Sequence, residues 1–261
     1  MLTAEEVDRF VRDGFVYLPE AFPRELADEC RAFLWRETGL DPDDPATWTK
    51  PVIRLNGYGG DLFNAAANTP VLREAFDQLV GTGRWFPRDG LGTFPIRFPH
   101  PDDPGDAGWH MEGSYSVEGE QGYWLNLRCR GRALLMLFLF SDTGPDDAPT
   151  RIKVGSHLDV PLFLVAAGDR GMSFPAACAA MDAAGKLDSP DRKLALATGH
   201  PGSVYLCHPF LIHAAQPHRG REPRFMAQPP LIPVAPLELR RADGAYSPVE
   251  LAVLRGLGSP A

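Results

Sequence analysis

From about Gly90 onward, clusters of proline, glycine and aspartate interrupt the chain so often that a long helix cannot form there. Proline and glycine each account for 26 of the 261 residues, which for proline is about twice the average usage. Short runs rich in apolar residues lie between these clusters, as is typical of strands. These runs are 93–98, 123–128, 134–140, 151–154, 203–207 and 224–231. This part of the chain therefore predicts an antiparallel β region.

The first 80 residues show a helical pattern instead. Thr3 and Glu6 have the spacing of a capping box, which predicts a helix that begins there and ends at Gly14, with a short strand at 15–18. Two further helices are predicted by apolar residues that recur at helical spacing: Leu26, Cys30, Phe33 and Leu34, and then Val71, Leu72, Ala75, Phe76, Leu79 and Val80.

Two later segments are also expected to be helical. One is the alanine-rich stretch 174–186, and the other begins at Ser247, where Pro248 and Glu250 complete a capping pattern. Helices followed by many strands indicate an α+β, mainly β, class with helices packed on a jelly roll or barrel. We expect one domain over 1–261, divided as a mainly helical part (1–85), a strand core (90–231) with an insertion at about 161–200, and a tail with a short helix (232–261).

The charge balance favours a small-molecule partner. The net charge is −8, the isoelectric point is about 5.4 and no run of Lys or Arg occurs, which argues against nucleic acid or an anionic membrane surface as the partner. The four cysteines lack CxxC spacing, so neither a zinc knuckle nor a disulfide framework is predicted. The sequence has no secretory leader pattern and no window of about 18 apolar residues, so we expect a cytoplasmic protein.

His110 and Glu112 are the first candidate metal ligands. On an extended backbone, side chains at i and i+2 point to the same face, so these two converge while Met111 points away. An imidazole and a carboxylate on one face are two of the three ligands of a 2-His-1-carboxylate facial triad. Taken alone, the pattern fits a solvated surface pair as well.

A second group of candidates lies about a hundred residues later. His208 and His213 are five residues apart, so in a continuous strand they face opposite sides, and we expect only one of them to be a ligand. If residues 213–224 form a symmetric hairpin around 218–219, His213 and Arg224 are cross-strand neighbours. Arg224 could then bind the far carboxylate of a dicarboxylic acid whose other end chelates the metal.

Three motifs together carry a resemblance to a known family. They are Trp109-His-x-acid, then Asp142 followed by Val-Gly-Ser-His157, and then His208-Pro-x-Leu-Ile-His213 with Arg224 eleven residues later. In these motifs the sequence resembles the phytanoyl-CoA dioxygenase-like Fe(II)/2-oxoglutarate-dependent oxygenases, over about 90–231, roughly half of the chain.

The resemblance implies a double-stranded β-helix, a cupin-like jelly roll. It also implies that His110, Glu112 and His213 bind Fe(II) and that Arg224 binds the C5 carboxylate of 2-oxoglutarate. Arg54 matches a basic residue that contacts the co-substrate in some members, although a surface arginine is an equal alternative. The implied activity is a dioxygenase that uses O2 to hydroxylate a small organic substrate, with succinate and CO2 as co-products.

Two residues depart from the family pattern. Glu112 stands where aspartate is commoner, and Ala215 stands where relatives can carry a hydroxyl for the co-substrate. Related halogenases have a small residue in place of the acid, which admits halide. Glu112 therefore favours hydroxylation over halogenation. These departures leave open a cupin-like small-ligand binding protein with an impaired metal centre, and a zinc hydrolase is a third alternative.

The remaining charged and histidine residues have more ordinary explanations. Arg97, at a strand centre, either binds an acidic ligand or pairs with a core acid, because a buried charge is costly without a partner. His157 is expected to close a turn, and His200 and His218 are expected in exposed loops.

Overall fold

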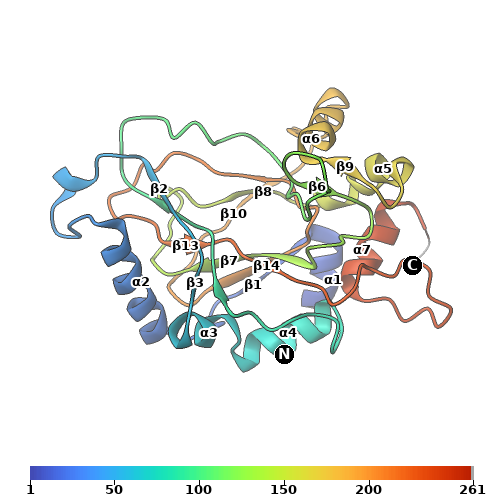
Figure 1. Ribbon diagram of the computed structural model, residues 1–261, viewed down its shortest axis with the longest axis horizontal. Coiled ribbons are helices and arrows are strands. Elements are labelled where there is room, and N and C mark those ends of the chain that lie inside the picture. Colours follow the sequence, from blue (N-terminus) through green and yellow to red (C-terminus); the bar gives the residue numbers. More distant parts are fainter. Residues whose placement is uncertain (260–261) are drawn as a thin grey trace.

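The strand β7 (Leu134–Leu139) is the centre of the larger sheet, and all of its residues are buried. Successive side chains of a strand point to opposite faces. Accordingly, Met136 and Phe138 belong to the main core, whereas Leu135, Leu137 and Leu139 belong to a second cluster on the other face. A strand that is covered on both faces has a continuous apolar sequence. The computed structural model describes residues 1–259. Their helices and strands are arranged in layers around β7 (Figure 1).

The sheets are antiparallel. The larger sheet has the strand order β1-β11-β7-β13, and β14 also pairs with β7. The smaller sheet has the order β10-β8-β12, and three further pairs are β2–β5, β3–β4 and β6–β9. The strands are β1 Phe15–Leu18, β2 Val52–Leu55, β3 Tyr58–Gly59, β4 Gly90–Leu91, β5 Phe94–Arg97, β6 Trp124–Leu125, β8 Arg151–Lys153, β9 Met172–Ser173, β10 Leu194–Leu196, β11 Val204–Cys207, β12 His213–Ala214, β13 Met226–Ala227 and β14 Pro230–Leu231.

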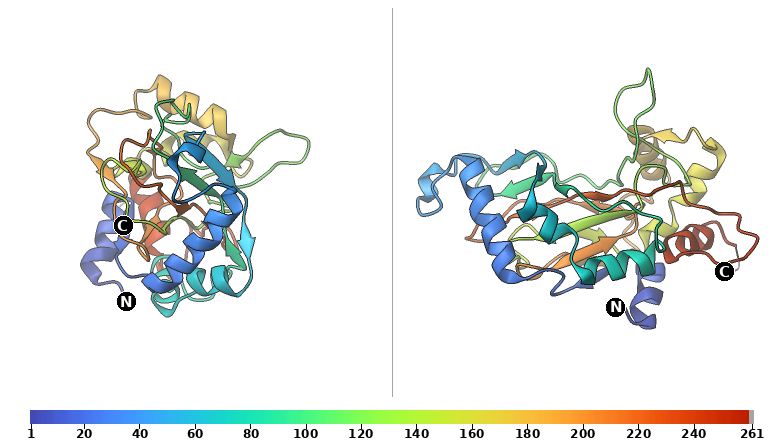
Figure 2. Two further views of the ribbon diagram at one scale, coloured as in Figure 1. Left: turned by 90° about the vertical axis from the view of Figure 1, so that its left-hand side faces the viewer. Right: turned by 60° about the horizontal axis from the view of Figure 1, so that its bottom comes forward.

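Helices cover the outer face of the larger sheet. In the views of Figures 1 and 2, α2, α3 and α4 run along that face, while α1 and α7 pack together at one end of the strands. The helices are α1 Ala4–Asp13, α2 Arg24–Thr38, α3 Asp61–Ala67, α4 Pro70–Leu79, α5 Pro161–Leu164, α6 Phe174–Ala183 and α7 Pro248–Gly256, with 3-10 turns η1 Pro45–Thr47, η2 Ser156–Leu158 and η3 Val165–Ala167. Over residues 1–259, no helix is both long and apolar enough to cross a membrane.

The predicted helices are confirmed. The Thr3–Glu6 capping box is formed, and α1 ends at Gly14, whose φ of 89° is left-handed. The second capping box, at Ser247, begins α7 with Pro248 in its first turn. The apolar patterns predicted α2 and α4, and the alanine-rich insertion forms α6.

Two strand predictions were wrong in extent. The run 224–231 is divided into β13 and β14, because Pro229 and Pro230 lack the backbone N–H that a continuous ladder requires. The run 123–128 forms a strand only at 124–125. Strands β2 and β3 also lie within the part of the chain that was expected to be mainly helical.

Candidate metal centre

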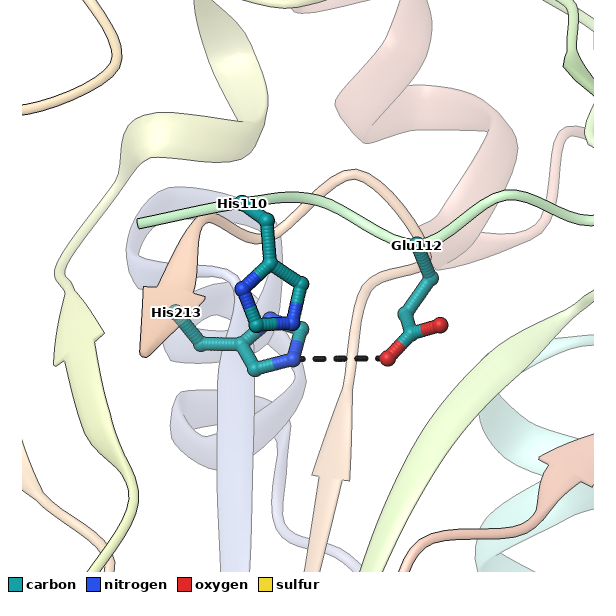
Figure 3. A group of neighbouring side chains, drawn as sticks. All are labelled: His110, Glu112 and His213. Carbon is teal, nitrogen blue, oxygen red and sulfur yellow. Dashed lines mark ion pairs between the residues drawn. The ribbon is translucent and has the colours of Figure 1, made fainter. Parts of the chain in front are cut away.

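His110 is fixed by its backbone to the strand that carries His213. The N–H of His110 donates to the carbonyl of His213 (3.0 Å), and the N–H of His213 donates to the carbonyl of His110 (2.9 Å). His213 itself lies in β12, opposite Ile152 of β8. Met111 is fully buried, whereas His110 and Glu112 turn together to the other face, as the i, i+2 spacing predicted (Figure 3).

These three side chains form a compact group of metal-binding atoms. One ligand atom from each of His110, Glu112 and His213 lies within 4.8 Å of the others. The Oε1 atom of Glu112 is 3.5 Å from Nε2 of His213, and the two imidazole centroids are 4.4 Å apart (Figure 3). The spacing alone could not decide between His208 and His213, whereas the family resemblance implied His213, and the structure places His213 in this group.

The hydrogen bonds of both imidazoles leave their Nε2 atoms available to a metal. Nδ1 of His110 lies 2.9 Å from the carbonyl of Gly108, and Nδ1 of His213 lies 3.0 Å from that of Leu211. A proton on Nδ1 satisfies each carbonyl and leaves the Nε2 lone pair free. Nε2 of His213 is buried and has no hydrogen-bond partner within residues 1–259. Two imidazoles and one carboxylate with such an unpartnered nitrogen suit a divalent transition metal.

The electrostatics keep the group in a ligating state. Burial lowers the pKa of His110, and His213 lowers it further, so its neutral form is favoured. Burial alone would raise the pKa of Glu112, but interactions with His213 and the charge of Arg132 outweigh it and lower that pKa to about 2. The carboxylate is therefore ionised at neutral pH.

A cavity of about 200 Å³ adjoins the two histidines and is lined by Arg54, Arg97 and Arg224. Arg224 is almost fully buried, and burial, followed by repulsion from Arg97, lowers its pKa to about 9, so it keeps its charge at neutral pH. Arg97 donates to Asp106 Oδ2 at 2.6 Å, and Arg54 contacts the same oxygen. Arg97 thus pairs with an acid, which is one of its two sequence interpretations, and its side chain also lines the cavity.

The predicted hairpin between His213 and Arg224 is wrong. The backbone of Arg224 pairs with Arg97 of β5, and His213 pairs with His110 and β8, so the two residues pair with different segments and not with each other. The intervening turn folds against another loop instead, because the N–H groups of Arg219 and Gly220 both donate to the carbonyl of Asp146. His213 and Arg224 nevertheless line the same cavity.

A larger cavity of about 650 Å³ also adjoins the candidate ligands His110 and Glu112. His110 and Gln228 line both cavities, and Phe174, at the start of α6, places the insertion at the wall of the larger one. Arg132 also lines it, with Nη2 3.4 Å from Glu112 Oε2. Sequence reasoning missed Asp106, Arg132, Thr150 and Gln228, because isolated polar residues in turns and strand ends carry no periodic signal.

The other histidines lie outside this group. His157 is in the turn η2 and His208 is in the core, and both are fully buried. His200 is exposed, as expected. The expectation for His218 was wrong: its side chain is buried because it bonds the carbonyl of Glu222 and the N–H of Gly220 within the turn.

Comparison with known proteins identifies the fold but no sequence relative. No protein-family model and no curated protein matches the sequence. Among solved structures, HygX from Streptomyces hygroscopicus, with nickel and 2-oxoglutarate bound, is 17% identical with a TM-score of 0.55, covering 87% of this chain and 86% of that one. SnoN, a non-heme alpha-ketoglutarate-dependent epimerase from nogalamycin biosynthesis, is 16% identical with a TM-score of 0.56, covering 86% and 80%. A hypothetical protein of Escherichia coli, JW0805, is 13% identical with a TM-score of 0.58, covering 99% and 82%. At these identities the likeness establishes a shared fold.

Proposed function

We propose that this chain is a phytanoyl-CoA dioxygenase-like Fe(II)/2-oxoglutarate-dependent dioxygenase that hydroxylates a small organic substrate and releases succinate and CO2. The observation that carries the proposal is the position of the His110–Glu112–His213 group beside a small cavity that contains three arginines. A metal with open positions next to a dicarboxylate pocket is what this reaction requires. HygX, which shares the fold, has a solved structure with nickel and 2-oxoglutarate bound. SnoN, which also shares the fold, is an alpha-ketoglutarate-dependent epimerase.

Each residue has a defined part in this proposal. His110, Glu112 and His213 hold Fe(II), which supplies the activation of O2 when bound. Arg224 binds the far carboxylate of 2-oxoglutarate, and Arg54 contributes from the rim of the same cavity. Thr150 offers a hydroxyl on that cavity wall, where Ala215 offers none.

The finer features of the fold belong to the same proposal. The larger and smaller sheets, which face each other across the cluster of Leu137 and Ile152, form a double-stranded β-helix. Residues 1–261 act as one oxygenase domain, located in the cytoplasm. The larger cavity receives the substrate, and the insertion at 161–200 contributes to its selection through Phe174 and Pro175.

The test is anaerobic addition of Fe(II) and 2-oxoglutarate to the purified protein, followed by visible absorption spectroscopy. A metal-to-ligand charge-transfer band is expected, and Arg224→Ala is expected to weaken it at a given 2-oxoglutarate concentration. Arg221→Ala is the matched control, because Arg221 is exposed in the same turn region. If neither Fe(II) nor 2-oxoglutarate binds, the oxygenase proposal is overturned.

The alternative that Glu112 and Ala215 leave open is a cupin-like binding protein with an impaired metal centre. An oxygenase couples O2 uptake to succinate release, whereas a binding protein does neither. Measuring both with a panel of candidate substrates separates the two. A zinc hydrolase would act without 2-oxoglutarate and in the absence of O2.

A further inference from the structure

Arg132 is a buried cation whose hydrogen-bonding capacity is mostly unused. Only 12% of its side chain is exposed, and it lines the cavity of about 650 Å³ beside the candidate metal ligands. Of its nitrogens, Nη2 has acceptors, the Glu112 carboxylate at 3.4 Å and the Gly113 carbonyl at 3.3 Å, and both distances are long. Nε and Nη1 have no partner within residues 1–259. A buried guanidinium with so few acceptors is costly unless a ligand supplies more.

The turn that places Arg132 at this wall has an unfavourable backbone conformation. Cys129, a non-glycine residue, has a φ of 45°, and its carbonyl accepts from the N–H of Arg132 at 3.2 Å. A Cβ atom on Gly131 would lie 2.0 Å from the carbonyl oxygen of Ser114, so glycine is required for the turn to lie against that segment. Strained positions of this kind cluster at ligand sites. The turn therefore holds Arg132 next to the chain that carries Glu112.

The charges around Arg132 favour an anion. Glu112 is the acid that faces it in the cavity, and this carboxylate is assigned to the metal in the proposed function. Arg88 adds positive charge nearby: burial lowers its pKa first, and repulsion from Arg132 lowers it further. Nε and Nη1 of Arg88 donate to the carbonyls of Gly90 and Pro230. Glu112 faces His213 with Oε1 and Arg132 with Oε2, so a metal held at Oε1 would share the carboxylate charge with Arg132.

A second unpartnered polar group lies on the same wall. Ser114 lines the cavity, and its hydroxyl is buried and has no hydrogen-bond partner within residues 1–259. Phe174, Pro175, Pro230 and Ile232 form an apolar part of the wall, which also includes the polar residues Thr93, Gln121 and Gln228. A few polar groups beside an apolar wall are typical of a site that orients one end of a ligand.

We propose that the substrate is an apolar molecule that carries a carboxylate, and that Arg132, assisted by Ser114, binds this carboxylate beside the metal. This inference rests on the proposed function for the reaction, but the binding preference itself does not require turnover. Arg132 would thereby select acids over their neutral analogues.

The test compares two probes of equal shape, 3-phenylpropanoate and 3-phenylpropanamide, by ligand-observed NMR titration. The titrations are made with Zn(II) and 2-oxoglutarate present and again without them. With both present, we expect the acid to bind at least about tenfold more tightly than the amide, because a buried polar site rejects a ligand that cannot complete its hydrogen bonds. Without them, Glu112 competes for Arg132 and the preference is expected to shrink.

Variants identify the residue responsible for the preference. Arg132→Gln should abolish the preference for the acid, Arg132→Lys should restore part of it, and Ser114→Ala should reduce it. Arg130→Gln is the matched control, because Arg130 is exposed two residues away and is expected to leave the preference unchanged.

Each other outcome contradicts the inference. Equal binding of acid and amide, no saturable binding of either, or an acid preference that survives in Arg132→Gln would each overturn it. If Arg132 only orients Glu112, Arg132→Gln weakens Zn(II) binding without changing the ratio of the two probes. Failure of Zn(II) and 2-oxoglutarate to bind at all would instead overturn the proposed function, and the titrations without them would still measure the preference.

Discussion

His110 and His213 exchange both of their backbone hydrogen bonds, at 3.0 and 2.9 Å, although they are a hundred residues apart in the sequence. This pairing holds two candidate ligands together through the main chain and independently of their side chains. Each imidazole is further oriented by a carbonyl of its own segment. Removing one ring should therefore change metal binding much more than folding.

The first prediction concerns His213→Ala. Its backbone pairing with Ile152 and His110 is retained, so we expect a near-native far-UV circular dichroism spectrum. Metal affinity, measured by calorimetric titration, should fall more than about 100-fold. This loss exceeds the loss of metal affinity that is typical for residues that only orient the ligands. His200→Ala, at an exposed histidine, should leave it unchanged. Metal affinity that survives His213→Ala would remove this residue from the site.

The second prediction concerns the length of the acidic side chain. In the protein, Glu112 Oε1 lies 3.5 Å from Nε2 of His213. In Glu112→Asp the shorter side chain places the carboxylate farther from both His213 and Arg132. Metal affinity should fall by roughly tenfold, because the rest of the site is built around the longer side chain. Tighter binding in the aspartate variant would instead mean that Glu112 impairs the centre and would favour the binding-protein alternative.

The third prediction is that Asp106→Asn tightens 2-oxoglutarate binding. Asp106 holds both Arg54 and Arg97 at the co-substrate cavity, so its charge competes with an entering dianion. Because Asp106 is partly exposed, a gain of about three- to tenfold is expected in the dissociation constant measured by titration. Asp103→Asn, in an exposed part of the same loop, is the control. Weaker binding would show that Asp106 orients the arginines rather than competing with the ligand.

The fourth prediction is a loss of stability in mild acid that depends on His157. Burial lowers its pKa to about 4 in the folded protein, and burial, followed by repulsion from His157, lowers that of His208 well below its usual value. The unfolded chain therefore binds more protons than the folded one as the pH falls from about 6.5 to about 4. Each such histidine reduces the unfolding free energy by up to about 1.4 kcal/mol per pH unit in that window.

Urea unfolding at several pH values measures this effect. His157→Gln should lower the stability at neutral pH but should flatten its decline in acid. An unchanged slope in His157→Gln would contradict the prediction.

The fifth prediction compares two glycines that end helices. Gly14 and Gly39 both have positive φ, 89° and 69°, but a Cβ on Gly14 would lie 2.5 Å from His157 Nδ1, while nothing lies within 4 Å of one on Gly39. Gly39→Ala should cost about 1–2 kcal/mol of unfolding free energy from backbone strain alone. Gly14→Ala adds a steric clash in the core and should cost more than about 3 kcal/mol. Equal losses in the two variants would argue against tight packing at His157.

Several features followed from the sequence because they depend on neighbouring residues. The capping boxes at Thr3 and Ser247 each close hydrogen bonds over three residues, so the start of α1 and of α7 could be predicted. The shared face of His110 and Glu112 follows from the two-residue repeat of extended chain. The apolar run 134–140 indicated a strand, and the structure shows that both of its faces meet a core.

The tertiary structure decided which distant residues meet. The sequence pattern predicted that a hairpin joins His213 and Arg224, whereas in the structure their backbones pair with different segments and their side chains line one cavity. Asp106 and Arg132 reach the site through turns, where no periodic pattern indicates the direction of a side chain. Their positions depend on the pairing of strands that are far apart in the sequence, and that pairing is set by the burial of whole sheet faces rather than by local spacing.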